Sequence, residues 1–223
     1  MPLNISLKTL GILAIASVVS VNAWALGGGG SSGASKMIIG DSIFALSGDI
    51  HRNLERALDE SIDSYARSGC QMNGGSLICS RRYAVPNQYA NASKRGIDTV
   101  IMNGGGNDFL LGDGGDCQTR QCVEDVLMGI EQTIAGMVSD MRRDGIEEIL
   151  FLGYYDTNDS ANNQINELST AYKVANYPAL GIKLVETREA FRGNESRYIS
   201  ADGIHPTSAG SRVLSDLILQ TLD

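Results

Sequence analysis

The sequence predicts a single doubly wound α/β domain, in which a mostly parallel sheet carries helices on both faces. Strand-like apolar runs recur along the chain, patterns typical of helices lie between them, and no repeat or second composition regime follows the N-terminal region. Strands that alternate with helices at this spacing are joined by crossover connections, which make neighbouring strands parallel. At 223 residues and 43% apolar content, the chain has room for one such domain with a sizeable core.

The pattern of apolar residues places four strands and three helices. The strands are expected at residues 36–40, 98–103, 147–153 and 182–186. Apolar side chains spaced three and four residues apart form one stripe on a helix. One stripe runs from Val123 to Met141, and Gly145 ends this helix. An earlier stripe consists of Ile50, Leu54, Leu58 and Ile62. A last helix is expected at 206–222. Pro206 fits the first position of that helix, where its missing N–H costs no hydrogen bond.

The first 25 residues are typical of a signal peptide. They contain one Lys and no acidic residue, an apolar stretch from Leu10 to Val21, and the small-x-small motif Ala23-Trp24-Ala25. The apolar stretch is shorter than the ~18 residues of a membrane-spanning helix. The alternative to a cleaved signal peptide is a retained membrane anchor. We therefore predict a signal peptide at 1–25, a Gly/Ser-rich linker at 26–34 and the folded domain at 35–223. The protein would be exported, periplasmic or secreted, without stable membrane insertion after cleavage.

The charge of the chain argues against one class of partner. The net charge is −8, and loss of the predicted signal peptide with Lys8 would leave 17 basic and 26 acidic residues. A surface this acidic repels phosphate backbones. We therefore expect no binding to nucleic acid.

Four cysteines form two close pairs in the sequence, Cys70 with Cys79 and Cys117 with Cys122. Export favours disulfides. Zinc sites usually combine closely spaced cysteines with further Cys or His ligands, whereas this chain has only two His and wider spacings. We expect two local disulfides, each closing a small loop. Three pairings are open from sequence, and free buried thiols are the alternative.

Three polar clusters follow predicted strands or open the last helix. They are Gly40-Asp41-Ser42, the Gly-Gly-Gly-Asn-Asp run at 104–108 and the Asp-Gly-Ile-His-Pro run at 202–206. In doubly wound sheets, ligands bind beyond the carboxyl ends of the strands, where loops distant in sequence converge. Taken singly, Ser42 could be a helix cap, Asn107 a turn residue and His205 a surface residue. Together the clusters contain a nucleophile, an oxyanion donor and an acid-base pair.

The chemistry that these residues favour is acyl transfer. A Ser42 hydroxyl attacks well once a neighbouring base removes its proton, and Asp202 is close enough in sequence to His205 to orient the imidazole as that base. The oxyanion of the tetrahedral intermediate needs hydrogen-bond donors. The Asn107 amide and the Ser42 N–H can provide two, and the Gly69 N–H a third.

The residues of these clusters resemble, in order and spacing, the four blocks of the SGNH hydrolases, also called the GDSL esterase/lipase family. The matching residues are Gly40-Asp41-Ser42, Gly69, Gly105-Gly106-Asn107-Asp108, and Asp202 with His205 and Pro206. The resemblance implies a flavodoxin-like three-layer α/β/α sandwich, a catalytic triad of Ser42, His205 and Asp202, and no metal or organic cofactor. It also implies an oxyanion hole of Ser42, Gly69 and Asn107. Ile43 departs from the Leu of the family motif, and only Ser68-Gly69 supports Gly69, with Gly74-Gly75 close by.

Three other features are weaker. His51 lies early in a predicted helix and is more typical of a solvated helix residue than of a second base. The Gly-Asp-Gly-Gly-Asp run at 112–116 resembles a fragment of a calcium-binding repeat, but it occurs once and is more typical of a solvated loop tied by Cys117. No glycine-rich loop fits a phosphate-binding fingerprint, so nucleotide binding is unsupported.

The sequence therefore predicts an exported, cofactor-independent serine esterase that acts on a small-molecule, lipid or glycan ester. If Phe109, Leu110, Leu111 and Tyr154-Tyr155 line a pocket beside Ser42 rather than pack under loops, an apolar acyl chain fits, as in a lysophospholipid or thioester. A shallow polar site would suit acetyl groups on sugars. The same sequence features would also fit an acyltransferase on this fold, or a non-catalytic domain that binds a glycan or a lipid.

Overall fold

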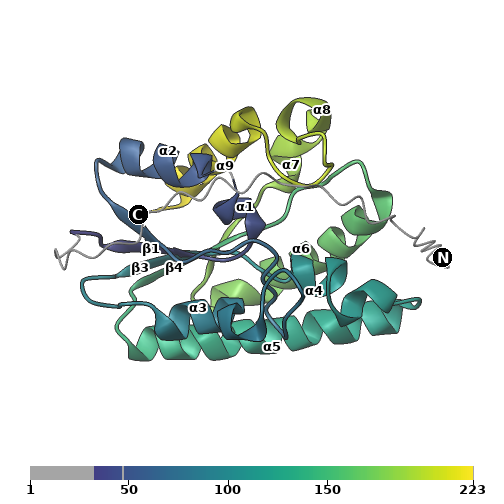
Figure 1. Ribbon diagram of the computed structural model, residues 1–223, viewed down its shortest axis with the longest axis horizontal. Helices are drawn as coiled ribbons and strands as arrows, with labels where there is room; N and C mark the ends of the chain where they lie inside the picture. Colours follow the sequence, from purple (N-terminus) through teal and green to yellow (C-terminus); the bar gives the residue numbers. More distant parts are fainter. Residues whose placement is uncertain (1–32, 47, 223) are drawn as a thin grey trace.

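The computed structural model describes residues 33–46 and 48–222, which form a five-stranded sheet with helices on both faces (Figure 1). All strand pairs are parallel, in the order β2-β1-β3-β4-β5. The strands are β1 (Lys36–Ile39), β2 (Ile62–Ser64), β3 (Thr99–Met102), β4 (Glu148–Leu152) and β5 (Lys183–Val185). The strand order reverses direction at β1, and at such a switch point the loops after neighbouring strands diverge and leave a crevice. The predicted fold class is confirmed.

Two layers of helices cover the sheet (Figure 1). One layer contains α1 (Ser42–Ala45), α2 (Asp49–Leu58), α7 (Arg188–Phe191), α8 (Glu195–Tyr198) and α9 (Ser208–Thr221). The other contains α3 (Val85–Asn91), α4 (Gly106–Leu110), α5 (Arg120–Arg143) and α6 (Ser160–Leu180). Two short 3-10 helices, η1 (Arg81–Tyr83) and η2 (Asp113–Asp116), lie in the connections. The result is the three-layer sandwich that the sequence resemblance implied.

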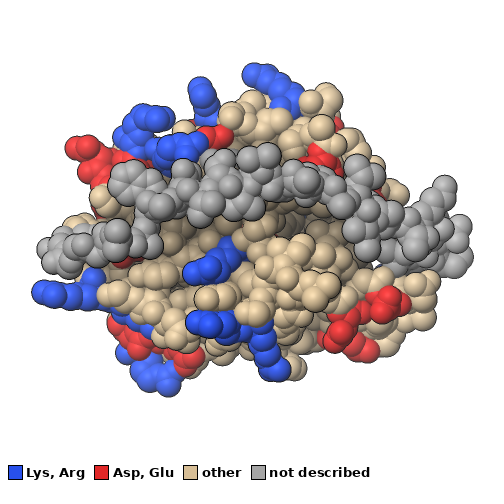
Figure 2. Space-filling view, in the orientation of Figure 1, with Lys and Arg blue, Asp and Glu red and all other residues tan. Residues whose placement is uncertain are grey.

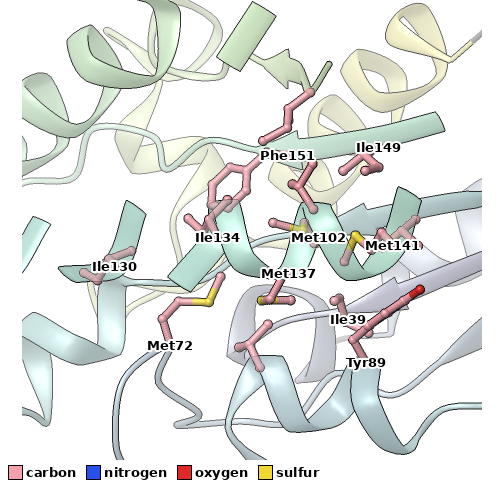
Figure 3. Close-up of a cluster of buried hydrophobic side chains, with 14 of the residues drawn as sticks. Ile39, Met72, Tyr89, Met102, Ile130, Ile134, Met137, Met141, Ile149 and Phe151 are labelled. Atoms are coloured by element: carbon pink, nitrogen blue, oxygen red, sulfur yellow. The ribbon is translucent and has the colours of Figure 1, made fainter. Parts of the chain in front are cut away.

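The core has two layers because successive residues of a strand point to opposite faces of the sheet. In β1, Met37 and Ile39 belong to the cluster beneath α3, α5 and α6, and Ile38 belongs to the opposite one. Figure 3 shows the first cluster, where Ile134, Met137 and Met141 of α5 lie against Ile39, Met102, Ile149 and Phe151 of the strands, and Ile130 lies further along the helix. The stripe that predicted this helix is therefore its buried face.

The early helix is shorter than its apolar stripe. α2 ends at Leu58, and Asp59 follows with a left-handed φ of 51°. Ile62 lies in β2, paired with Lys36 of β1. The prediction that Ile62 continues the helix is wrong, because the four-residue interval after Leu58 spans a tight turn. β2 has three residues, too few to produce a pattern of its own.

The last helix begins later than predicted, at Ser208. Thr207 caps it, since the Thr207 hydroxyl accepts from the Gly210 N–H at 3.1 Å. Pro206 instead forms an antiparallel bridge with Ile199. The prediction that Pro206 opens the helix is wrong, because the threonine provides the cap one position further on. His205 therefore lies in the preceding loop.

The apolar spacing does not predict α6, although this helix has 21 residues. Its fully buried positions are Lys173 and Tyr177, so it has hardly any apolar stripe. The Lys173 ammonium lies 2.6 Å from a carboxylate oxygen of Glu131 on α5, and both side chains are buried. A buried ion pair thus joins α6 to α5, a contact that hydrophobic periodicity cannot reveal.

Two disulfides join Cys70 to Cys79 and Cys117 to Cys122, so the predicted local pairing is confirmed. The first closes the loop between β2 and η1, and the second ties η2 to the start of α5. The predicted signal peptide and most of the predicted linker lie outside the described residues. Within 33–46 and 48–222, no helix has both the length and the apolar character needed to cross a bilayer.

Candidate active site

Ser42 lies where β1 passes into α1, and its neighbour Asp41 caps that helix. The Asp41 carboxylate accepts from the Ile43 N–H at 3.0 Å. The alternative in which Ser42 is the cap is therefore wrong, and the Ser42 hydroxyl takes no part in the cap. Ser42 is the first helical residue, so its own N–H has no partner within the helix.

Gly40 allows the sharp turn between β1 and Ser42. Its φ is +148°, and a Cβ at this position would lie 1.9 Å from Oδ1 of Asn103. The Gly40 N–H donates to the Gln88 side chain at 2.8 Å, and the Gln88 amide donates to the Gly40 carbonyl at 2.9 Å. Only glycine fits here, and Gln88 fixes the turn from the side of α3.

Asp41 is the centre of a buried network. Asn103, directly after β3, donates to the Asp41 carboxylate at 2.8 Å and accepts from the Asp41 N–H at 3.0 Å. The Tyr154 hydroxyl, after β4, donates to the same carboxylate and accepts from the Gly106 N–H at 3.1 Å. Burial, followed by the charge of Asp41, raises the pKa of Tyr154 well above its usual value, so the hydroxyl stays protonated. The network therefore joins the loops after β1, β3 and β4.

Sequence reasoning missed these roles of Asp41, Asn103 and Tyr154. The signal that could have found them is position, since each residue follows closely on the end of a strand. The same criterion singled out Ser42 and Asn107.

His205 and Asp202 form a close pair in the loop before α9. His205 Nδ1 lies 2.7 Å from one Asp202 oxygen. The other oxygen accepts from the N–H groups of Ile204 and His205, each at 2.9 Å, and from the Ser200 hydroxyl at 2.7 Å. Partial burial opposes ionisation of Asp202, but these hydrogen bonds outweigh it and hold the pKa of Asp202 below its usual range. The carboxylate is therefore ionised at neutral pH and orients the imidazole.

The second ring nitrogen of His205 is turned away from this pair. Nε2 is buried and has no hydrogen-bond partner among the described residues. The neighbouring Ile204 carbonyl accepts from the Tyr155 hydroxyl at 2.7 Å, which ties the loop to the end of β4. Ile204, Ser42 and Asn107 line one pocket, so the structure brings the three predicted clusters to the same edge of the sheet.

Asn107 and Gly69 lie on two segments that hydrogen bonds clamp together. The Asn107 amide donates one hydrogen to the Cys70 carbonyl at 3.0 Å, which leaves its second hydrogen for another acceptor. The Gln71 side chain donates in return to the Asn107 carbonyl at 3.3 Å. Gly69, directly before Cys70, has a left-handed φ of +73°. These contacts place Gly69, rather than Gly74 or Gly75, next to the residue that Asn107 contacts.

Asp108 strengthens the same clamp from inside the protein. Its carboxylate accepts from the N–H groups of Met72 at 2.8 Å and Asn73 at 2.7 Å. Burial raises the pKa of Asp108 to about 6, against the opposing effect of these two hydrogen bonds. A buried carboxylate therefore fixes the loop after Gly69 to α4. The sequence indicated only that Asp108 belongs to a cluster.

The pocket beside Ser42 is mainly apolar. Phe109, Leu110, Tyr154 and Tyr155 line it, so four of the five side chains considered from the sequence lie there. Leu111 is absent from the lining and is exposed. The remaining wall comes from Asp41, Ile43, Gly106, Ile165, Thr157, Asn162 and Asn166.

The weaker sequence features have structural explanations. His51 Nε2 lies 2.8 Å from the Ile62 carbonyl, so this half-buried histidine links α2 to β2. The 112–116 run forms η2, beside the Cys117–Cys122 disulfide. Among residues 33–46 and 48–222, no group of three or more His, Cys, Asp or Glu side chains could hold a metal ion.

Comparison with known families gives one match. Residues 38–213 match the model of the GDSL-like Lipase/Acylhydrolase family. No curated protein matches the chain.

Several solved structures share the fold. They include the lipase Lip_vut3 from a goat rumen metagenome, at 18% identity and a TM-score of 0.66, covering 84% of this chain and 97% of that one. A putative SGNH hydrolase from Slackia heliotrinireducens has 17% identity and a TM-score of 0.62, covering 85% and 100%. A variant of Axe2, an acetyl-xylooligosaccharide esterase from Geobacillus Stearmophilus, has 14% identity and a TM-score of 0.62, covering 85% and 94%.

Proposed function

Because the chain belongs to the GDSL-like lipase/acylhydrolase family, serine hydrolases that act on esters, we propose that it hydrolyses carboxylic esters through an acyl-enzyme on Ser42. The observation that carries this proposal is the arrangement at one edge of the sheet. Ser42 shares a pocket with Asn107. The adjoining loop contributes His205, which Asp202 orients through Nδ1. Nε2 of His205 is buried and has no hydrogen-bond partner among the described residues.

The first half of the reaction forms the acyl-enzyme. Nε2 of His205 removes the Ser42 proton as Oγ attacks the ester carbonyl carbon, and Asp202 stabilises the resulting imidazolium. The oxyanion accepts hydrogen bonds from the N–H groups of Ser42 and Gly69 and from the second amide hydrogen of Asn107. When the intermediate collapses, the carbon–oxygen bond to the leaving group breaks, and the departing alcohol takes the proton from His205.

The second half releases the acid. His205 removes a proton from water, whose oxygen attacks the carbonyl carbon of the acyl-enzyme. The same donors hold the second oxyanion, and its collapse returns the proton to Ser42 Oγ as the acid leaves. The proposed steps use only these side chains, backbone N–H groups and water.

The acyl group is an apolar chain in this proposal. Phe109, Leu110, Ile165 and Tyr155 surround the space beside Ser42, and such a surface favours hydrocarbon over a hydroxylated group. Long-chain carboxylic esters, lysophospholipids and thioesters therefore fit as substrates. Export to a periplasm or the medium is part of the proposal, supported by the N-terminal 25 residues and by the two disulfides.

A carbohydrate O-acetyl esterase is the second candidate. Thr157, Asn162 and Asn166 add hydrogen-bonding groups to one side of the pocket, where a sugar leaving group could bind. The fold shared with an acetyl-xylooligosaccharide esterase is consistent with this candidate.

A series of aryl esters from acetyl to long acyl chains tests the proposal, with Ser42→Ala as the inactive control. We expect kcat/KM to rise with chain length and a fluorophosphonate probe to label Ser42. A preference for acetyl would favour the sugar esterase, and transfer to an added alcohol in place of hydrolysis would indicate an acyltransferase. Activity that survives Ser42→Ala would contradict the mechanism, and ligand binding without any turnover would indicate a non-catalytic domain.

A further inference from the structure

Seven large apolar side chains are exposed among the described residues, and five of them lie at the C-terminal ends of α1 and α4 and on the loop that the Cys70–Cys79 disulfide closes. We call these five residues the apolar rim: Leu46, Leu77, Ile78, Leu110 and Leu111. The other two, Met128 and Val174, lie on α5 and α6. Exposed aliphatic side chains scattered singly need no explanation, but several that gather on neighbouring segments mark an interaction site.

Contacts tie the rim to the candidate active site. Leu110 lines the pocket that contains Ser42. Ile78 and Leu111 both lie within 4 Å of the position that a Cβ on Gly69 would occupy. Leu77 and Ile78 share a surface groove with Ala45, the last residue of α1.

A disulfide and hydrogen bonds fix the loop that carries Leu77 and Ile78, so both side chains remain exposed to solvent. The Cys70–Cys79 disulfide closes it. The Ser76 N–H donates to the Cys79 carbonyl at 2.8 Å, and the Ser76 hydroxyl accepts from the N–H groups of Ile78 and Cys79 at 3.2 Å each. Leu77 is 108% exposed at the tip. Because the disulfide and these hydrogen bonds hold the turn, the Leu77 side chain stays exposed to solvent and is available to insert into a lipid layer.

Basic side chains flank the loop in an otherwise acidic chain. Residues 64–97 contain five Lys or Arg and no Asp or Glu, whereas the whole chain carries a net charge of −8. The guanidinium groups of Arg67 and Arg82 lie 4.1 and 4.7 Å from the Tyr83 ring centroid. Arg81 is exposed beside them. Figure 2 shows a group of basic side chains near the middle of this face, and basic and acidic side chains mixed toward its edges.

We propose that the apolar rim, with Arg67, Arg81 and Arg82, docks the protein on an anionic lipid surface. Aliphatic side chains insert at the boundary between headgroups and acyl chains, and guanidinium groups bind the lipid phosphates. The pocket beside Ser42 then opens toward the lipid, which would supply the ester. The inference deepens the proposed function, on which it rests, by naming a lipid ester at an interface as the substrate.

The net negative charge of the chain does not oppose such docking at ordinary ionic strength. Exposed charges more than about 10 Å from the surface are screened at 0.1 M salt. Arg67 lines the same groove as Leu77 and Ile78, Arg82 lines the neighbouring groove, and none of the described residues that line these two grooves is a carboxylate. Binding should therefore weaken as salt rises.

Vesicle binding tests the inference. The full chain is expressed with Ser42→Ala, so that lipids stay intact, and its sedimentation with phosphatidylcholine vesicles is compared with and without phosphatidylglycerol. We expect binding that strengthens at least tenfold with the anionic lipid. Leu77→Asp should weaken it at least tenfold, because the tip can no longer insert, and Arg81→Gln with Arg82→Gln should weaken it about fivefold per guanidinium.

Matched controls separate the rim from general surface effects. Val174→Asp changes another exposed aliphatic residue, and Arg56→Gln with Arg143→Gln removes two exposed guanidinium groups elsewhere. These controls should leave vesicle binding within twofold. With Ser42 restored, every variant should hydrolyse a soluble aryl ester at the parental rate.

The outcomes are distinguishable from failure of the proposed function. Absence of vesicle binding, or equal weakening by Leu77→Asp and Val174→Asp, would overturn the docking inference while hydrolysis of soluble esters stands. Tighter, Leu77-dependent binding to an insoluble acetylated polysaccharide would also overturn it, since the rim would then serve a glycan. Loss of all ester hydrolysis in the parent would overturn the proposed function, whereas the Ser42→Ala vesicle experiment would still report on the rim.

Discussion

The Tyr154 hydroxyl donates a hydrogen bond to the buried carboxylate of Asp41, the residue that caps α1 and precedes Ser42. This contact joins the ends of two strands that are not neighbours, since Asp41 follows β1, Tyr154 follows β4, and β3 lies between them. Tyr154 also lines the pocket beside Ser42. One side chain therefore both fixes the helix that begins with Ser42 and forms part of the wall of the proposed acyl site.

Tyr154→Phe should reduce both stability and activity. Asp41 would lose a donor while staying buried, which costs about 1–3 kcal/mol of unfolding free energy. We expect kcat for a soluble aryl ester to fall about tenfold or more, because α1 would no longer be held in position. Urea unfolding and steady-state kinetics measure the two effects. Tyr172→Phe, on the half-exposed surface of α6, is the control and should change neither.

Asp202→Asn should impair catalysis far more than folding. The amide cannot hold His205 in the tautomer with a proton on Nδ1, so we expect kcat to fall on the order of 10²–10⁴-fold with KM little changed. Asp216→Asn, an exposed position on α9, is the matched control. A decrease below tenfold would contradict the proposed role of the pair.

The depressed pKa of Asp202 also makes a prediction about pH. A carboxylate whose pKa is lowered by folding stabilises the protein above its unfolded pKa, and that contribution is lost only as pH falls through the folded value. An acid limb of kcat/KM at about pH 5–7 would therefore belong to another group, because Asp202 remains ionised there. Such a limb should persist, at reduced amplitude, in Asp202→Asn.

Asp108→Asn should change how stability depends on pH. Folding raises the pKa of Asp108 from 3.8 to about 6, so the folded state binds more protons than the unfolded state between these values. Stability contributed by this group is then present at low pH and is lost as pH rises through about 6. The parent-minus-variant difference in unfolding free energy should fall by about 1–3 kcal/mol from about pH 4 to about pH 7.

Urea titrations of both proteins at several pH values measure that difference. Asp113→Asn, at an exposed position of η2, is the matched control. If the difference for Asp108→Asn stays constant or rises with pH, the buried carboxylate does not titrate in this range.

Gly40→Ala should be much more damaging than alanine at a comparable glycine. Gly40 and Gly193 both have positive φ, but a Cβ on Gly193 meets nothing within 4 Å, whereas a Cβ on Gly40 would collide with Asn103. Gly193→Ala should cost about 1 kcal/mol for backbone strain alone. Gly40→Ala should cost at least about 3 kcal/mol and abolish ester hydrolysis, because Asn103 must move out of the Asp41 network. Thermal unfolding and activity of the two variants make the comparison, and equal costs would show that the clash with Asn103 is relieved cheaply.

The sequence by itself determined the fold class, four of the five strands and the long buried face of α5, and it favoured the local pairing of the cysteines that the structure then confirmed. These features depend on periodicity and short-range spacing, which are present in the chain before it folds. The candidate residues Ser42, Asn107, Asp202 and His205 could be selected for the same reason, since each stands in a cluster beyond a strand or before the last helix.

Only the tertiary structure decided how those clusters are held. Asn103 reaches Asp41 from the neighbouring strand β3 and Tyr154 reaches it from β4, one strand further away. Asp108 fixes the loop after Gly69, and Lys173 pairs with Glu131 between two helices. Such polar contacts join residues far apart in sequence and leave no periodic trace. The boundaries at Ile62 and Pro206 were likewise decided by contacts outside the helices, a strand partner in one case and a bridge to Ile199 in the other. Periodicity predicts which face of a helix or strand is buried. Long-range hydrogen bonds decide where the element ends and how the side chains at its end are held.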